Sequence, residues 1–309
     1  MGSAASARKG SDMTKALVLS GGGSVGIAWQ TGLATGLARH GVDLSAADLI
    51  VGTSAGSAVG AQLALGGDAE ERFDRYKQIE TSTAPPASSN GAPDPSMAER
   101  MAKLMEIMAE SMDDDGEPEA RRAAIGKFAL EADATPEEAF VGFFRYLHDE
   151  KWPAHYKCTA VDAATGEFVV WDEPAGVPLD RAVASSCCVP GLFSPITING
   201  HRYMDGGMRS GTNADLAVGH DSVLIVTLMT RERMAGAADD RLARLFQTMD
   251  GEQKALADSG ASVEIVGPDE GAAKVMGLNL MDAAVGPDAA AEGLRQGEAI
   301  AERIVKFWG

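Results

Sequence analysis

The sequence predicts an α/β protein, a three-layer sandwich with a mostly parallel central sheet and a helical insertion. Short apolar runs alternate with segments of helical pattern along the chain, which is the order expected for a parallel sheet covered on both faces. Two of the apolar runs end abruptly in glycine-rich turns, as buried parallel strands do. Residues 68–150 have a different sequence pattern, in which polar and acidic turns separate helical segments. We assign these residues to the insertion.

The first strand and helix are joined by a glycine-rich loop. Residues 16–19 form an apolar run typical of a buried strand, a helix is expected over 27–38, and 20–26 should connect them. Consecutive glycines let bare backbone approach a ligand, and N–H groups at the start of a helix favour negative charge. The loop is therefore a candidate oxyanion site. Its glycines are Gly21, Gly22, Gly23 and Gly26.

The second strand and helix place a serine on a tight turn. Residues 49–51 run directly into Gly52-Thr53-Ser54-Ala55-Gly56, and the small residues 57–65 that follow are compatible with a helix. This is the layout of a nucleophile elbow, in which flanking glycines relieve crowding and the hydroxyl is pushed out at a helix N-terminus. Ser54 is therefore the candidate nucleophile.

The first loop also fits the G-x-G-x-x-G fingerprint of dinucleotide-binding proteins. That fingerprint requires an acidic residue at the end of the next strand, where it would bind a ribose. Here the strand ends in Gly52-Thr53-Ser54, and Asp48 lies before it. We therefore prefer an acyl-transfer site to a nucleotide site, and we expect no cofactor and no metal.

Within the insertion, methionines recur at helical spacing between Met97 and Met112. Flexible thioethers at this spacing suit a core helix, and they also suit an adaptable wall for an acyl chain. The hypothesis is that residues 97–112 form a mobile lid over Ser54. A second helix is expected to start at Thr135-Pro136-Glu137-Glu138, with a threonine cap, a proline in the first position and acids in the first turn.

After the insertion the pattern returns to strands. The expected strands are 157–161 and 167–171, which flank a turn as a hairpin, 222–229 and 262–266, and the expected helices are 239–258 and 287–307. The chain shows no internal repeat and no clean domain boundary. We therefore expect residues 1–13 to be a disordered tail or cloning remnant and 14–309 to form a single domain.

A third motif, Asp205-Gly206-Gly207, supplies a carboxylate. Taken alone, Asp-Gly-Gly is ordinary turn chemistry. A hairpin turn at Asn199-Gly200 leads into the strand end at Met204-Asp205, and the segments on both sides are rich in turn residues, which usually lie at a surface or at the mouth of a site. With the other two motifs it completes the parts of an acyl-transfer site: oxyanion donors, an exposed serine and a base.

The order and spacing of these three motifs resemble those of the patatin-like phospholipases. The resemblance covers about residues 17–213, including the segment 184–195 that leads to the aspartate. It implies a Ser–Asp dyad that works without histidine, in which Ser54 matches the nucleophile and Asp205 the base. It also implies a serine acyl-hydrolase whose substrate is a lipid carboxyl ester, cleaved by a phospholipase or lysophospholipase type of reaction.

The dyad is also consistent with the properties of its two groups. An unperturbed aspartate, with a pKa of about 3.9, is a poor base for a serine hydroxyl. Burial of Asp205 would raise its proton affinity, and a helix N-terminus at Ser54 would stabilise a developing alkoxide. N–H groups of Gly22, Gly23 and Ala55 would then stabilise the tetrahedral oxyanion.

The headgroup of the substrate stays open. Patatin-like enzymes often carry Lys or Arg where this chain has Val25, so a cation that could help hold an anionic group is missing. The residues do not choose between phospholipids, lysophospholipids, monoacylglycerols and thioesters. They also leave open the acyl position and the oligomeric state.

Two alternatives compete with the dyad. In a Ser–His–Asp triad of the order Ser…Asp…His, only His220 follows Asp205, and His201 lies in the hairpin turn just before it. We interpret both as loop histidines. The alternative from another class is a non-catalytic module that binds lipid or nucleotide on the same fold. A carboxylate within hydrogen-bond reach of Ser54 would favour the enzyme.

Composition limits the partners. The net charge of −18 argues against nucleic acid and against attraction to anionic membranes, so contact with a membrane or micelle is expected to be transient. Three cysteines, Cys158, Cys187 and Cys188, make neither a disulfide framework nor a metal-binding spacing. No apolar run approaches the length of a membrane span and no signal peptide is visible, so a cytoplasmic location is expected.

Overall fold

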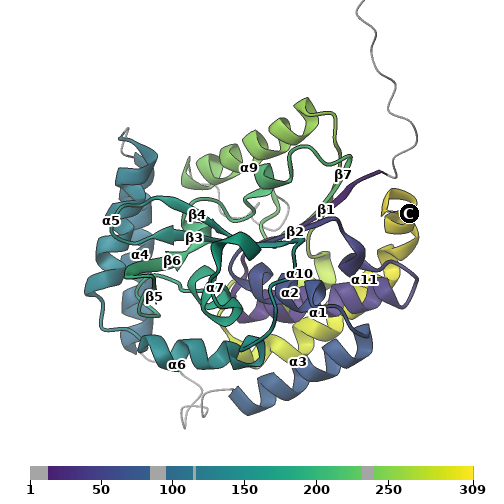
Figure 1. Cartoon of the computed structure of the whole chain (residues 1–309), viewed down its shortest axis with the longest axis horizontal. Helices are drawn as coiled ribbons and strands as arrows, with labels where there is room; N and C mark the ends of the chain where they lie inside the picture. The colour runs from purple at the N-terminus through teal and green to yellow at the C-terminus, as the bar shows by residue number, and fades with distance from the viewer. Residues whose placement is uncertain (1–12, 84–94, 114–115, 232–239, 309) are drawn as a thin grey trace, which may run out of the picture.

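A mixed eight-stranded sheet forms the centre of the part of the chain that the computed structural model describes, residues 13–83, 95–113, 116–231 and 240–308 (Figure 1). The expected tail, apart from Met13, lies outside these residues. The strand order is β5-β6-β3-β2-β1-β7-β8, and β4 pairs with β3. The strands are β1 (Lys15–Leu19), β2 (Leu49–Gly52), β3 (Tyr156–Asp162), β4 (Phe168–Trp171), β5 (Ile196–Ile198), β6 (His201–Asp205), β7 (Ser222–Val226) and β8 (Ser262–Val266).

The direction of the strands divides the sheet in two. Strands β3, β2, β1, β7 and β8 run parallel to one another. Strands β4, β5 and β6 form antiparallel pairs at the other end of the sheet. The prediction of a mostly parallel sheet is confirmed, and so is the hairpin of β3 and β4.

Apolar side chains are buried on both faces of the sheet. In β1, Leu17 and Leu19 pack into the core on one face, whereas Ala16 and Val18 pack into the core on the other. Side chains alternate between faces along a strand, so a strand that is apolar at every position must be covered on both sides. This arrangement confirms the predicted three layers.

The helices divide between these two faces, with α9 on one side of the strands and α1, α3 and α11 on the other (Figure 1). The face of Leu17 and Leu19, called the first face below, carries α1 (Gly23–Ala38), α2 (Ala55–Ala64), α3 (Ala69–Thr83), α7 (Leu179–Ser186), α10 (Glu270–Met276) and α11 (Gly286–Trp308). The second face carries α4 (Pro95–Asp113), α5 (Pro118–Glu131), the 3-10 turn η5 (Ala214–Ala217) and α9 (Asp240–Asp258).

Short elements connect these layers. Helix α6 (Glu137–Val141) continues into the 3-10 helix η2 (Gly142–Leu147), and both pack on the first face. The remaining 3-10 turns are η1 (Leu44–Ala46), η3 (Glu173–Ala175), η4 (Gly206–Met208) and η6 (Ala283–Val285).

Helices α1 and α11 pack closely through their glycines. A Cβ added to Gly32 would lie 2.1 Å from the carbonyl oxygen of Ala290, and one added to Gly293 would lie 2.2 Å from that of Trp29. The Trp29 indole N–H also donates to Gln296 Oε1 at 3.1 Å. The contact leaves no room for side chains, and it fixes the helix that follows the glycine-rich loop.

Helices α1 and α6 begin at residues other than those predicted. Helix α1 begins at Gly23 instead of residue 27, and the carbonyl of Leu280 accepts the N–H of Val25 in its first turn. Helix α6 begins at Glu137, and Thr135 forms a backbone bridge to Phe193 instead of capping it. In both cases the partner is remote in the sequence, so local pattern could not reveal it.

Strand β3 brings the ends of two other strands together. Strand β4 pairs with Cys158–Val161 along one edge of β3, so β2 and β6 must share the other edge. Gly52 at the end of β2 is opposite Cys158, and Asp205 at the end of β6 is opposite Ala160. The two strands run in opposite directions and their last residues meet along this edge.

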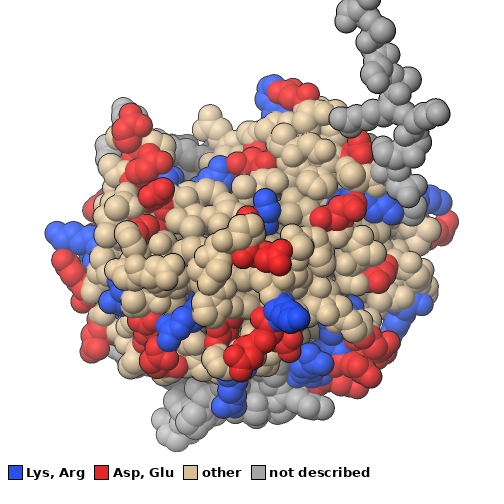
Figure 2. Space-filling model, viewed as in Figure 1, with Lys and Arg blue, Asp and Glu red and all other residues tan. Residues whose placement is uncertain are grey.

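The surface carries charges of both signs. Asp and Glu side chains are interspersed with Lys and Arg over the face in Figure 2, and over the whole chain 45 acidic residues outnumber 27 basic ones. None of the helices in the described residues combines the length and the apolar character that crossing a membrane requires.

Candidate active site

Ser54 lies on a strained turn between β2 and α2. Its backbone has φ 53° and ψ −121°, a conformation that costs free energy for any residue other than glycine. The two glycines of the motif are required by close packing: a Cβ on Gly52 would lie 2.5 Å from the Cα of Ser57, and one on Gly56 would lie 2.1 Å from the carbonyl oxygen of Leu19. The side chain stands at the N-terminus of α2, as expected of a nucleophile elbow.

Asp205 is buried beside this turn. It is only 2% exposed, and its Oδ1 accepts the N–H of Gly207 at 2.7 Å. Burial raises the pKa of this carboxyl group to about 7, while the nearby Ser54 hydroxyl and the hydrogen bond from the Gly207 N–H act in the opposite direction. The structure therefore places the two residues of the predicted dyad close together, and the Asp205 carboxyl group can exchange a proton near neutral pH.

Three backbone N–H groups are available for an oxyanion. Among the described residues, no hydrogen bond occupies the N–H of Gly22, Gly23 or Ala55. All three lie at the start of α1 or α2, where the helix dipole favours negative charge.

Gly21 was also predicted to donate to the oxyanion, but its N–H is already used within the protein. Its N–H donates to the carbonyl oxygen of Gly211 at 3.0 Å. A Cβ at this position would lie 3.3 Å from the Cβ of Ser54. Gly21 therefore lets the loop lie directly against the serine, and the hydrogen bond to Gly211 holds it there. Gly26 lies inside α1, where its N–H donates to the carbonyl oxygen of Gly22 at 2.8 Å.

Val25 is fully buried in the first turn of α1. The segment around Leu280 covers this turn, and a Cβ on Gly23 would lie 2.4 Å from the Leu280 carbonyl oxygen. The side chain at position 25 therefore packs into the core. Any cation that acts on substrate in this chain must come from another element.

Side chains that sequence reasoning did not single out hold the site in place. The N–H of Ser54 donates to Ser186 Oγ at 3.0 Å. Asn213, in the left-handed region at φ 50°, donates from Nδ2 to Ser210 O at 2.8 Å and to Thr53 Oγ1 at 3.0 Å. Asn213 thereby links Thr53, which precedes Ser54, to the loop that follows Asp205. Its left-handed turn is a conformation that Asn tolerates, and this was the only local signal.

Glu252 of α9 supports the same loop from the second face. It is 7% exposed, and its Oε2 accepts the N–H of Ala214 at 3.0 Å and the hydroxyl of Thr212. Burial raises the pKa of this carboxyl group. Nothing in the sequence near Glu252 indicated this contact, because its partners are about forty residues away.

The histidines of the alternative triad lie elsewhere. His201 Nδ1 is 3.0 Å from Asp162 Oδ2 and its side chain is 63% exposed, while His220 Nδ1 is 3.0 Å from the carbonyl oxygen of Ala217. Within the described residues, no histidine forms a hydrogen bond with Ser54 or Asp205. The geometry therefore favours the dyad over the triad.

The three cysteines are buried free thiols. Cys187 Sγ donates to the carbonyl oxygen of Ser54 at 3.0 Å, so it packs behind the turn. Burial raises the pKa of Cys187 and Cys188 well above the usual value, which keeps both thiols neutral. The described residues contain no group of three or more His, Cys, Asp or Glu side chains that could hold a metal ion.

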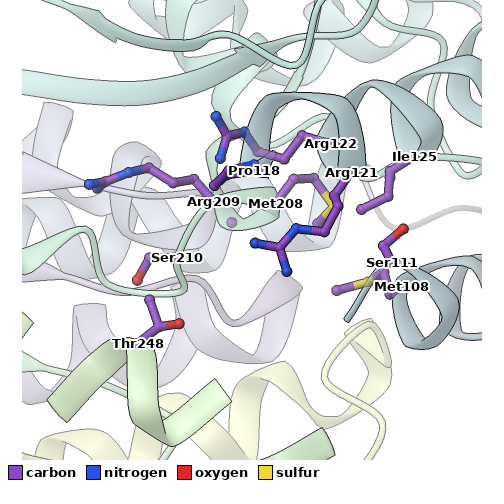
Figure 3. Close-up of a pocket in the computed structure, with 11 residues that line it drawn as sticks. Met108, Ser111, Pro118, Arg121, Arg122, Ile125, Met208, Arg209, Ser210 and Thr248 are labelled. Atoms are coloured by element: carbon purple, nitrogen blue, oxygen red, sulfur yellow. The ribbon is translucent and has the colours of Figure 1, made fainter. Parts of the chain in front are cut away.

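A pocket of about 350 Å³ adjoins the loop that follows Asp205 (Figure 3). Gly207 and Met208 line it from that loop, and Met108 lines it from α4. Leu104 of the same helix is buried and Met105 is 53% exposed, while the side chains of Met97 and Met112 lie outside the described residues. A lid over Ser54 stays a prediction.

Comparison with known proteins gives one family. The family model for Patatin, described as patatin-like phospholipase, matches residues 17–218, well over half of the chain. No curated protein sequence matches the chain.

Two solved structures are similar at low identity. VipD from Legionella pneumophila is 14% identical, with a TM-score of 0.44, over 95% of this chain and 67% of its own. The type III effector protein ExoU is 16% identical, with a TM-score of 0.40, over 94% of this chain and 53% of its own. The chain thus spans about two thirds of the length of the first and about half of the second.

Proposed function

The chain belongs to the patatin-like phospholipase family, and from that premise we propose that it hydrolyses lipid carboxyl esters through an acyl-enzyme on Ser54, with Asp205 as general base. One observation carries the proposal. A buried carboxyl group, whose pKa burial raises to about 7, lies close enough to a serine hydroxyl on a strained turn for that hydroxyl to lower this pKa. A base with this pKa can accept the serine proton at neutral pH and return it in the next step.

Acylation uses the contacts of the dyad. Asp205 takes the proton of the Ser54 hydroxyl as the oxygen attacks the ester carbonyl carbon. The negative charge on the carbonyl oxygen is stabilised by the unoccupied N–H groups of the two loops, those of Gly22, Gly23 and Ala55. Collapse of the tetrahedral intermediate breaks the ester bond, and Asp205 gives its proton to the departing alcohol oxygen.

Deacylation repeats these steps with water. Asp205, again unprotonated, removes a proton from a water molecule that attacks the acyl-Ser54 carbonyl carbon. The same N–H groups stabilise the second oxyanion. The acid product leaves, and the proton returns to the Ser54 oxygen. The lipid is reached by transient contact with a membrane or micelle.

A fluorophosphonate ester probe tests the proposal, because it forms a covalent bond only with an activated serine. Mass mapping of the labelled protein should place the adduct on Ser54. The Ser54→Ala variant should lose labelling, and Asp205→Asn should label much more slowly. Ser57→Ala is the matched control, since Ser57 lies in the same helix and its hydroxyl donates to the Ser54 carbonyl oxygen at 2.7 Å; it should retain labelling.

The same experiment separates the enzyme from a non-catalytic binding module. A module has no need of a carboxyl group beside Ser54, so its serine would not be activated. Absence of labelling in intact wild-type protein, over a range of pH and with detergent or lipid present, would contradict the proposed function. Labelling that persists in Ser54→Ala would contradict the assignment of the nucleophile.

A further inference from the structure

The pocket beside the loop that follows Asp205 is built from four elements of the chain. Helices α4, α5 and α9 surround it, and the loop of Gly207 to Ser210 forms another wall (Figure 3). Gly207 is the residue whose N–H holds the Asp205 carboxylate. Ser210 precedes Gly211, whose carbonyl oxygen accepts the N–H of Gly21 beside the nucleophile. The pocket therefore adjoins the loop that holds both the base and the oxyanion loop.

The charged side chains that line this pocket are all arginines. They are Arg121 and Arg122 in the first turns of α5, and Arg209 after η4. No Asp or Glu belongs to the described lining residues, although the chain as a whole has a net charge of −18. Hydroxyl groups of Ser111, Ser210 and Thr248 complete the polar part of the lining.

Arg209 and Arg122 make their contacts at the edge of the pocket. Arg209 makes two hydrogen bonds to Asp215, at 2.8 and 2.6 Å, and its guanidinium lies 4.3 Å from the ring centroid of Phe168. Arg122 donates to the carbonyl oxygen of Gly166 at 2.6 Å and to Glu119 at 3.0 Å. These contacts hold both guanidinium groups in place before any ligand arrives.

Arg121 extends toward the middle of the pocket. Its guanidinium lies among the labelled side chains of the lining in Figure 3, between Ser111 on one side and Ser210 on the other. Burial lowers the pKa of Arg122, and the positive charges of Arg209 and Arg121 act in the same direction. The charges of Arg121 and Arg209 therefore both act on Arg122, and an anion in the pocket would be attracted by these guanidinium groups.

The remaining lining is apolar. Met108, Ile125 and Met208 supply it, together with Pro118 at the start of α5. A site that combines guanidinium groups, hydroxyls and apolar side chains suits an amphiphile with an anionic group better than a free polar anion.

We propose that this pocket binds the phosphate group of a phosphate-bearing lipid ester, with Arg121 as the cation that determines headgroup specificity. The inference rests on the proposed function, because the acyl bond of that same lipid is the one that Ser54 attacks. Gly207 lines the pocket and its N–H donates to the Asp205 carboxylate, so a phosphate group bound in the pocket would lie against the loop that follows the base.

A kinetic comparison tests the headgroup assignment. Lysophosphatidylcholine and a monoacylglycerol with the same acyl chain are compared by their ratio of kcat/KM. Arg121→Gln should lower this ratio at least about tenfold, the loss of a charge-assisted hydrogen bond. Arg121→Lys, which keeps the charge, should restore part of it. Lys127→Gln removes a charge from an exposed position of the same helix and should leave the ratio unchanged.

An equal loss on both substrates in Arg121→Gln would overturn the inference, because it would mean that Arg121 only supports the fold. A ratio that falls as much in Lys127→Gln would also overturn it, since a general loss of positive charge would then suffice. Thermal unfolding of each variant shows whether the fold is intact. If Arg121→Gln does not fold, the comparison is made with Arg121→Lys, whose ratio must then fall measurably for the inference to stand.

A binding experiment separates this inference from the proposed function. The Ser54→Ala protein is titrated calorimetrically with a short-chain lysophosphatidylcholine below its micelle concentration, and with inorganic phosphate. Binding of the lipid that weakens at least about tenfold in Ser54→Ala, Arg121→Gln would support the pocket even if wild-type protein hydrolysed no ester. Tighter binding of inorganic phosphate than of the lipid would assign the site to free phosphate and overturn the lipid source. No binding of either ligand would overturn the pocket itself.

Discussion

The two faces of the central sheet are packed in different ways. On the first face, α1 and α11 approach so closely that a Cβ on Gly32 or Gly293 would lie little more than 2 Å from a backbone oxygen. On the second face, α4, α5 and α9 leave a pocket of about 350 Å³ between them. Ser54 and the unoccupied N–H groups belong to elements of the close-packed face, whereas the loop after Asp205 lines the pocket.

This difference indicates that one face positions the reacting groups and the other makes room for the substrate. Catalytic groups must be held within a fraction of an ångström of their productive geometry, and close-packed backbone does this better than flexible side chains do. A substrate needs room, which the second face supplies. Asp205 stands where the two meet, because β3 pairs with both β2 and β6 along one edge.

The largest expected effect is on catalysis, which we assign to Ser54 and Asp205 where the two faces meet. Replacement of Ser54 by alanine removes the nucleophile, so turnover of a p-nitrophenyl acyl ester should fall at least about 10⁴-fold. The unfolding temperature should not fall, because alanine lacks only the hydroxyl. If the variant retained a tenth of the activity, Ser54 would not be the nucleophile.

A pair of glycine replacements tests the close packing of the first face. Gly32→Ala forces a methyl group against the Ala290 carbonyl oxygen and should lower the free energy of unfolding by at least about 2 kcal/mol. Gly251→Ala is the matched control on α9, where nothing lies within 4 Å of the added Cβ. It should raise the free energy of unfolding by about 0.5–1 kcal/mol, as alanine favours the helix. If both variants changed the free energy of unfolding in denaturant by the same amount, the two faces would not differ in how closely they are packed.

The buried Asp205 should destabilise the fold at alkaline pH. Burial raises its pKa from 3.8 to about 7, so between these values the folded state binds a proton that the unfolded state lacks, and the free energy of unfolding falls as pH rises. Asp205→Asn removes this penalty. It should stabilise the protein above pH 8 by at most about 4 kcal/mol, and the difference should vanish below about pH 4. A pH-independent difference in denaturant unfolding would contradict burial of a charged group.

A smaller effect is expected where the two faces are linked. Asn213→Ala removes the hydrogen bonds from Nδ2 to Thr53 and Ser210, and alanine is less tolerant of the left-handed backbone. We expect kcat to fall about tenfold with little change in KM, because the turn of Ser54 and the loop after Asp205 would no longer be held in fixed positions relative to each other. Asn213→Asp keeps an acceptor and not the donor, and should behave like alanine. A rise in KM alone would place Asn213 at the substrate instead.

Local sequence predicted the parts of this molecule that local chemistry determines. The elbow at Ser54 was predicted because a strand, two flanking glycines and a helix are contiguous. The strand order could not be predicted, and with it the meeting of Asp205 and Ser54 along β3, because register depends on pairing between remote segments. The resemblance to a family supplied that link in advance.

The supporting contacts were beyond local pattern for the same reason. Glu252 reaches Thr212 from another helix, and Leu280 closes the first turn of α1 from the far end of the chain. The spacing of the methionines between Met97 and Met112 fitted both a core helix and a lid, since periodicity shows which residues share a face and not what they face. The pocket could not be predicted either, because α4, α5, the loop after Asp205 and α9 come together only in the folded chain.

The most direct test of the account is the rate of fluorophosphonate labelling at Ser54 as a function of pH. If Asp205 is the base, the wild-type rate should rise with pH through a single ionisation near 7, the pKa to which burial raises this carboxyl group. The rate in Asp205→Asn should be lower throughout and lack that ionisation. A wild-type profile that is flat near pH 7, or one that Asp205→Asn reproduces, would contradict the dyad.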